Sequence, residues 1–271
     1  MSNTVLDDLN SKLKIARKIV NKKEKVKAKG KLRLGIDLGT SDVVSMVLDE
    51  KNEPVAVCLK WADVVRDGVV LNFFGATQIV KEQLDTLEQN LGIRFEVANT
   101  SFPPGTDARI SVNVLEAAGL KVESVIDEPS AVANMLSLDK AAVIDIGGGT
   151  TGIAVVKKGK VIYSGDEPTG GRHVTLTIAG NLNASLEEAE EKKINDGKTV
   201  WPIVKPVFEK MADIARDHLK GHKVETLYLS GGSCALPGVR DLFQHEFPDY
   251  TVILPDDPIF LTPLSIAAYS E

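Results

Sequence analysis

The stretch AAVIDIGGGTTGIAVV, residues 141–156, decides the fold of this chain. Its glycines and threonines lie between two apolar runs, and Asp145 stands near the end of the first run. The GxGxxG spacing of residues 147–152 satisfies a dinucleotide fingerprint, which requires a helix directly after the glycines. Instead, β-branched residues on both sides of the Lys-Lys-Gly-Lys turn at 157–160 predict a β-hairpin. The stretch therefore predicts a glycine-rich turn between strands and excludes a Rossmann site.

The same pattern occurs once before in the chain. Ile-Asp-Leu-Gly at 36–39 matches Ile-Asp-Ile-Gly at 144–147. Each copy is followed by two hydroxyl residues, then by an apolar strand, a polar turn and a second apolar strand. Such a repeat predicts an α/β fold of two duplicated lobes, with a ligand cleft between them.

The segments between and after the two copies have clear periodicity. Strands are predicted over 95–103, 121–128 and 224–230, and helices over 74–91, 107–120, 128–138 and 185–193. We expect four units in all: an N-terminal helix and basic linker (1–31), a first lobe (32–140), a second lobe (141–257) and a C-terminal helix that returns to the first lobe (258–271).

The two glycine turns have the composition of phosphate sites. Glycine exposes backbone N–H groups that can converge on an anion, and threonine and serine hydroxyls add donors without bulk. Asp37 and Asp145 cannot bind phosphate directly, because like charges repel. They are explained if a water-coated Mg²⁺ lies between them and the phosphates. Two facing turns would then hold a nucleotide triphosphate tail from both sides.

A third glycine cluster ends the predicted strand at 224–230. Gly231, Gly232 and Ser233 follow that strand, and a Pro-Gly turn and a helix come next. Ala235 replaces the last glycine of a G-x-S-x-G nucleophile elbow, so a serine hydrolase is excluded. Binding of a base and ribose is the better use of such a turn.

The N-terminal arm is basic although the whole chain has a net charge of −6. Lysines and arginines crowd residues 12–33, where Glu24 is the one acidic residue. Such an arm can bind nucleic acid or the acidic body of the same chain, and the scarcity of aromatic residues argues against nucleic acid. Apolar residues at helical spacing over 4–20 predict an amphipathic helix, followed by a flexible linker. The helix can dock on the body, fray, or detach and bind a partner.

The remaining composition excludes several classes of protein. No apolar run approaches the length of a membrane span, and no signal-peptide core precedes residue 30. Cys58 and Cys234 are far apart and outside any C-x-x-C motif, which excludes a disulfide framework or a thiolate zinc site. We expect a cytoplasmic protein.

Three motifs together resemble the actin-like ATPase superfamily, which includes actin, sugar kinases, heat-shock chaperones and bacterial cell-shape and division proteins. LGIDLGTSD (34–42) is similar to the first phosphate motif, DIGGGTTGIAVV (145–156) to the second, and LYLSGGSCALPGVRDLF (227–243) to the adenosine motif. The segment TSFPPGTDARISVNVLEAAGL (100–120), together with GGSCALPGV (231–239), more narrowly resembles the ethanolamine-utilisation protein J family, a chaperone-like component of a bacterial microcompartment.

This resemblance implies roles for individual residues. Asp37 and Asp145 would hold Mg²⁺ and its waters, and Glu128 would orient the attacking water with help from Asp145. The phosphate-binding residues would be Gly39, Thr40, Ser41, Gly147, Gly148, Gly149, Thr150 and Thr151. The adenosine side would comprise Gly170, Gly171, Glu190, Lys193, Gly231, Gly232 and Ser233.

The chain also departs from the chaperone pattern. The interval between the first glycine turn and residue 100 is short, and the segment that carries the chaperones' catalytic lysine has no counterpart. The resemblance therefore implies ATP and Mg²⁺ as cofactors but a slow ATPase at most. The segment at 170–193 is more similar to the division proteins and implies reduced outer subdomains.

Two functions remain open from the sequence. One is a nucleotide-dependent folding, assembly or reactivation factor associated with the microcompartment. Its partners would be ethanolamine-utilisation enzymes or shell proteins, reached through residues 4–20 acting as an address helix. The other is an actin-like filament or scaffold protein with weak or no ATPase activity.

Overall fold

The computed structural model describes residues 3–27, 30–62, 65–66 and 69–270. The strands of the first sheet are β1 (Arg33–Leu38), β2 (Asp42–Leu48), β3 (Pro54–Trp61), β6 (Val97–Phe102) and β7 (Lys121–Asp127). Those of the second sheet are β8 (Ala141–Ile146), β9 (Thr151–Lys157), β10 (Lys160–Glu167), β11 (Thr226–Ser230) and β12 (Thr251–Ile253). A separate small hairpin consists of β4 (Val65–Arg66) and β5 (Val69–Val70).

The two sheets have the same topology. Their strand orders are β3-β2-β1-β6-β7 and β10-β9-β8-β11-β12. In each, an antiparallel three-stranded meander is extended by two parallel strands. The predicted duplication of an α/β lobe is therefore confirmed, strand by strand.

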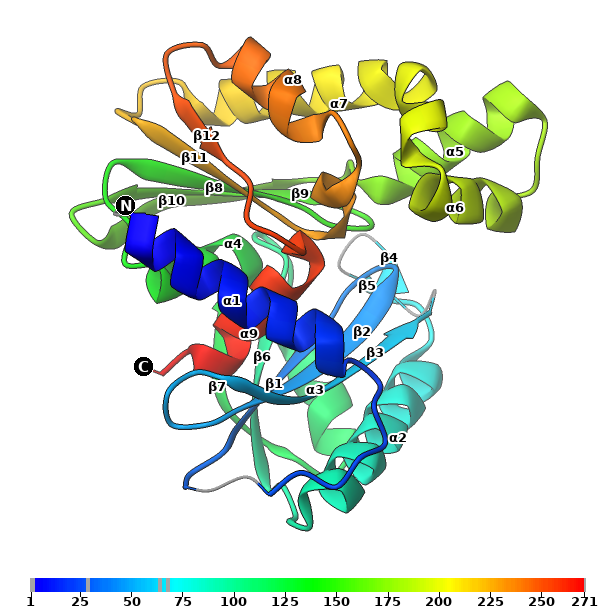
Figure 1. Cartoon of the computed structure of the whole chain (residues 1–271), viewed down its shortest axis with the longest axis vertical. Helices are drawn as coiled ribbons and strands as arrows, with labels where there is room; N and C mark the ends of the chain where they lie inside the picture. Colours follow the sequence, from blue (N-terminus) through cyan, green and yellow to red (C-terminus); the bar gives the residue numbers. More distant parts are fainter. Residues whose placement is uncertain (1–2, 28–29, 63–64, 67–68, 271) are drawn as a thin grey trace.

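The α-helices connect and cover these sheets (Figure 1). Their bounds are α1 (Asn3–Ile19), α2 (Phe73–Leu91), α3 (Arg109–Ala117), α4 (Glu128–Met135), α5 (Gly171–Leu182), α6 (Leu186–Asn195), α7 (Gly197–Leu219), α8 (Val239–Glu246) and α9 (Leu261–Ala268). Two 3₁₀ turns are η1 (Gly232–Ala235) and η2 (Pro258–Phe260). None of the helices in the described part of the chain is long and apolar enough to cross a membrane.

Helices α4 and α9 form a layer between the two sheets. Helix α4 follows β7 of the first sheet but packs on β8, β9 and β10 of the second. Helix α9 follows η2 at the end of the second lobe but packs on β1, β2 and β6 of the first, and the two helices contact each other. Their apolar faces share one buried cluster with both sheets, for example with Met46 and Val143. A single core therefore joins the lobes.

The outer face of each sheet has its own core. Helices α2 and α3 cover the first sheet, and α7 and α8 cover the second. Helix α2 begins after Asn72, whose Oδ1 accepts a hydrogen bond from the Gly75 N–H at 2.8 Å, and it ends at Gly92 in the left-handed region (φ +67°). Helices α5 and α6 project from the second lobe beside the cleft (Figure 1).

Helix α1 lies across the junction of the lobes, where it contacts β3 of the first lobe and η2 (Figure 1). Its apolar stripe, Leu9, Leu13 and Ala16, is buried in the cluster that joins the lobes. Arg17 pairs with Asp257 (Nε–Oδ1 2.7 Å), so the basic arm does meet acidic residues of the same chain. Of the three alternatives for this helix, the structure has the docked one, and a partner could reach the apolar stripe only after α1 detaches.

The linker after α1 is less free than its composition predicts. Residues 22–27 have no regular structure, but the Val26 N–H donates to the Asn90 carbonyl (2.8 Å) and the Asn90 amide donates to the Lys22 carbonyl (2.8 Å). The predicted solvated linker is confirmed in that the side chains of residues 22–25 and 27 are exposed, and the two hydrogen bonds tie the segment to the last turn of α2. Residues 28–29 lie outside the described part.

The docking of α1 predicts a stability difference between two residues of the same helix. Leu13→Ala removes a fully buried side chain and should lower the free energy of unfolding by about 2–5 kcal/mol. Val5→Ala, at a residue that is 43% exposed, should change it by less than about 0.5 kcal/mol. Urea unfolding of both variants measures the difference, and equal midpoints would show that α1 does not pack in solution.

Candidate functional site

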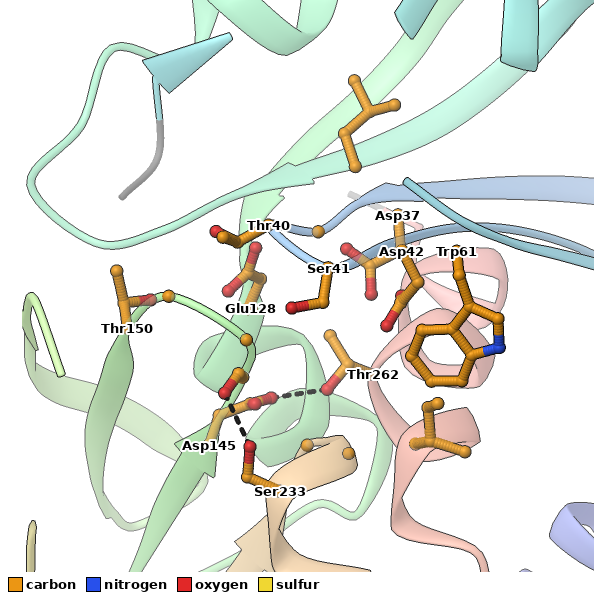
Figure 2. A pocket seen from close by; sticks show the side chains of 18 of the residues that line it. Asp37, Thr40, Ser41, Asp42, Trp61, Glu128, Asp145, Thr150, Ser233 and Thr262 are labelled. Carbon is orange, nitrogen blue, oxygen red and sulfur yellow. Dashed lines mark hydrogen bonds between the residues drawn. The ribbon is translucent and has the colours of Figure 1, made fainter. Parts of the chain in front are cut away.

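The two glycine turns face each other across a cavity between the lobes. Residues 39–41 connect β1 to β2, and residues 147–150 connect β8 to β9. Asp37 and Asp145 are each the last residue but one of a central strand, so both carboxyl groups point into this cavity (Figure 2). The matching positions follow directly from the duplicated topology.

The turns approach closely enough to touch. A Cβ added at Gly148 would lie 2.8 Å from the Ser41 Cβ and 3.0 Å from the Ser41 nitrogen, so only glycine allows this approach. The cavity at the turns has a volume of about 120 Å³. Ligand pockets typically measure about 300–1,000 Å³, so this cavity alone is smaller than a site for a whole nucleotide.

Five carboxyl groups line this cavity: Glu190, which pairs with Lys193, and the more crowded Asp37, Asp42, Glu128 and Asp145. Burial, together with the charges of Asp42 and Asp145, raises the pKa of Asp37 to about 8. Burial and the charge of Asp145 likewise raise the pKa of Asp42 to about 6, although Lys193 opposes the shift. Asp37 therefore holds its proton at neutral pH, whereas Asp42 loses most of its proton there.

The two other crowded carboxyl groups come from opposite lobes. Glu128 is the first residue of α4, and burial and the charge of Asp37 raise its pKa well above the usual range. Burial also raises the pKa of Asp145, against hydrogen bonds from Thr262 (Oγ1–Oδ2 2.5 Å) and Ser230 that stabilise its charged form. The cavity thus concentrates negative charge that a cation would relieve.

The donor set fits a water-coated magnesium ion. Among the described residues, no group of three or more His, Cys, Asp or Glu side chains is arranged to hold a metal directly. Mg²⁺ usually keeps several waters and takes one or two carboxylates plus phosphate oxygens. Asp37 and Asp145 are residues that could hold such an ion, through oxygen atoms alone.

A larger cavity of about 480 Å³ adjoins the first at the third glycine cluster. Lys193, Gly232 and Ser233 line both cavities. Gly231 adopts φ +87°, and a Cβ there would lie 2.5 Å from Asp145 Oδ1, so glycine is required. The Ser233 hydroxyl donates to the Gly147 carbonyl (2.8 Å), which ties this cluster to the second glycine turn.

The structure brings most of the predicted site residues together. Those that line the first cavity are Asp37, Gly39, Thr40, Ser41, Glu128, Asp145, Gly147, Gly148, Gly149, Thr150, Glu190, Lys193, Gly231, Gly232 and Ser233. Lys193 contacts Glu190 at 2.8 Å (Nζ–Oε2) and donates to the Thr175 hydroxyl.

Three predicted binding residues do not line either cavity. Thr151 is fully buried and donates its hydroxyl to the Thr169 carbonyl (2.7 Å). Gly170 packs against the backbone of Gly149, and the Gly171 N–H donates to the Gly147 carbonyl (2.9 Å). These residues lie behind the second turn and hold its shape.

Several residues of the site were not predicted from the sequence. Asp42 directly follows Ser41, so its place in the first motif was a usable signal. Trp61, Ile194, Ile259 and Thr262 also line the first cavity. These residues belong to β3, α6, η2 and α9, respectively. Their local sequence contains no motif that indicates a binding site.

Comparison with known proteins gives the family. The profile described as cell division protein FtsA matches residues 142–265, most of the second lobe and part of α9. The ethanolamine utilization protein EutJ of Escherichia coli (strain K12) is 63% identical over 237 residues, which cover 88% of this chain and 85% of that protein. The crystal structure of ethanolamine utilization protein EutJ from Carboxydothermus hydrogenoformans has a TM-score of 0.91 and 38% identity, covering 98% of this chain and 99% of that one. The chain belongs to the EutJ family.

A more distant structure shares the fold of this EutJ-family protein. A chain of the PilM-PilN type IV pilus biogenesis complex has a TM-score of 0.70 at 17% identity and covers 87% of this chain and 97% of that one. Together with the FtsA match, this confirms the actin-like ATPase fold that the three motifs imply. That fold implies nucleotide binding in the cleft between the lobes.

The raised pKa of Asp37 predicts a pH dependence of stability in this EutJ-family protein. The folded state keeps a proton up to pH about 8, whereas the unfolded chain loses it near pH 4. The folded state therefore binds more protons, and the free energy of unfolding should fall as the pH rises from about 5 to 8, by up to about 1.4 kcal/mol per pH unit. Asp37→Asn should flatten this slope, and Asp85→Asn, at an exposed residue of α2, should not. Urea titrations at several pH values, without nucleotide, measure it; an unchanged slope in Asp37→Asn would contradict the assignment.

The contact between the turns predicts a contrast between adjacent glycines. Gly148→Ala places a methyl group against Ser41 and should destabilise the nucleotide-free protein by about 1–3 kcal/mol. At Gly147 the nearest atom to an added Cβ is the Thr150 carbonyl oxygen at 3.6 Å, so Gly147→Ala should be nearly neutral. Thermal unfolding compares the two, and equal melting temperatures would mean that the turns do not touch in solution.

Proposed function

We propose that this protein binds Mg-ATP between its lobes and acts as a nucleotide-dependent folding, assembly or reactivation factor in ethanolamine utilisation. The observation that carries the proposal is the pair of matching turns, which bring Asp37 and Asp145 into one cavity from opposite sheets. The names of the relatives, ethanolamine utilization protein EutJ, supply the process. Its partners would be ethanolamine-utilisation enzymes or the shell of a bacterial microcompartment.

The geometry supports a switch between lobe arrangements. Phosphates that contact both turns would favour a closed arrangement of the lobes, and the approach of Gly148 to Ser41 brings the two turns within reach of one ligand. A ligand shifts such an equilibrium by its difference in affinity for the two arrangements. Helices α4 and α9, which connect the sheets, would transmit the change to the outer surface.

Glu128 is placed to serve slow hydrolysis. Its carboxyl group enters the cavity at the start of α4, where burial and the charge of Asp37 raise its pKa well above the usual range. Bound Mg²⁺ would supply positive charge, which stabilises carboxylates and the charge on the phosphates. An ionised Glu128 could then orient a water and accept its proton.

A scaffold or filament role is the second candidate. Relatives named for cell division and pilus assembly share the fold. Near the first lobe's small hairpin, Leu71, Phe73 and Phe74 are exposed, Phe74 by 84%. Exposed apolar patches of this kind mark interaction surfaces.

Calorimetry with Mg-ATP tests the proposal. The wild-type chain should bind, and Asp37→Ala should bind at least tenfold more weakly because the ion loses an oxygen partner. Glu128→Gln should keep binding but lose phosphate release, which is measured in parallel. Asp85→Ala, on the exposed side of α2, is the matched control and should behave as the wild type.

The same samples separate the two candidates. Sedimentation with Mg-ATP should leave a switching factor in the supernatant. Pelleting that requires nucleotide would instead support the filament role. Absence of binding in the wild type would overturn the nucleotide-switch proposal and leave a scaffold.

A further inference from the structure

The side chain of Trp61 stands at the mouth of the cleft, where the two cavities meet. It is 53% exposed and lines both the 120 Å³ cavity at the glycine turns and the 480 Å³ cavity beside Gly232. We propose that Trp61 is a nucleotide-binding residue of the first lobe, whose indole packs on the base or ribose of a nucleotide held by the second lobe. This inference rests on the proposed nucleotide binding and deepens it.

Within the described part of the chain, no apolar cluster or aromatic ring explains the position of the indole. Among the residues that the structure describes, Trp61 belongs to none of the three apolar clusters and stacks on no other aromatic ring. The second tryptophan, Trp201, differs: it packs on the core of the second lobe, with its ring centroid 5.6 Å from that of Phe208. A large aromatic side chain left half exposed beside an open cavity is typical of a binding surface.

The backbone ties Trp61 to the first phosphate turn. Trp61 is the last residue of β3 and pairs with Asp42, the first residue of β2. The next residue, Ala62, donates its N–H to the Ser41 carbonyl (3.0 Å). Since Ser41 and Asp42 line the phosphate end, any movement of this turn toward a ligand carries the indole with it.

The opposite wall of the cavity suits a flat ring. Ile194 of α6, which is 56% exposed, and Ile259 of η2 line the same two cavities as Trp61. Gly232, which has no side chain, also lines both cavities. Figure 2 shows Trp61 at the opposite end of the cavity from Thr150, so phosphates at the turns would place a base toward the indole.

One cation that lines the larger cavity is already engaged with other groups. Arg17 of α1 also lines the larger cavity, but its guanidinium pairs with Asp257 and lies over the Phe260 ring at 5.1 Å. We therefore assign the contact with the base or ribose of the nucleotide to Trp61. By covering the ligand from the first lobe, Trp61 couples occupation of the base site to closure of the cleft.

Two probes separate a contact with the ring from a contact with phosphate. Calorimetry is done with Mg-ADP and with Mg-tripolyphosphate, which has no base or ribose. Trp61→Ala should bind Mg-ADP about tenfold more weakly, as expected for loss of one aromatic stacking contact, and should bind Mg-tripolyphosphate with unchanged affinity. Trp61→Phe should keep most of the affinity for Mg-ADP.

Fluorescence supplies an independent readout, because the chain has two tryptophans. In a Trp201→Phe variant, the emission that remains is that of Trp61, and Mg-ADP should quench it or shift its maximum, whereas Mg-tripolyphosphate should change it much less.

Three results would overturn the assignment. The first is wild-type affinity of Trp61→Ala for Mg-ADP, and the second is an equal loss for both probes, which would show a role in shaping the phosphate turn. Either leaves the proposed nucleotide binding intact. If the wild-type chain binds neither probe, the proposed function fails and the role of Trp61 fails with it.

Discussion

The packing of α4 against α9 is the interaction on which the rest of the structure depends. Helix α4 follows the first sheet and lies on the second, whereas α9 follows the second lobe and lies on the first sheet, so the two sheets share one apolar interior. The same two helices also carry site residues. Glu128 is the first residue of α4, and the hydroxyl of Thr262, near the start of α9, donates a hydrogen bond to Asp145. The core that joins the lobes and the chemistry of the cleft are thus built by one pair of helices.

Electrostatics set the second constraint. The packing brings carboxyl groups from both lobes into a cavity where Lys193, itself paired with Glu190, is the nearby cation that opposes their charge. The repulsion among such buried carboxylates is reduced when they bind protons or when a cation binds between them. The raised pKa values of these groups reflect this crowding, and the same feature would make the cleft receptive to magnesium and phosphate together.

The sequence predicted the parts of the site that local chemistry dictates. A strand, an aspartate, glycines and hydroxyl residues, present twice, were enough to place both turns and to predict the duplicated sheets, because a backbone turn between strands has a local signature. Helix α2 was predicted almost to its ends for the same reason. Thr262 lies in the apolar run FLTPLSIAA, which indicates only a buried helix, and Trp61 ends an ordinary strand. Their place in the cleft is set by tertiary packing between segments about two hundred residues apart, which no local pattern encodes.

The close approach of Gly148 to Ser41 has a consequence for the rate of binding. If the empty protein rests with its turns in contact, a nucleotide cannot enter on every encounter and must wait for the lobes to part. Association would then be slower than the diffusional limit, and its observed rate would level off at high ligand concentration, at the rate of opening. The absence of a side chain at Gly148, which allows the turns to touch, would in this way determine how fast the protein binds nucleotide.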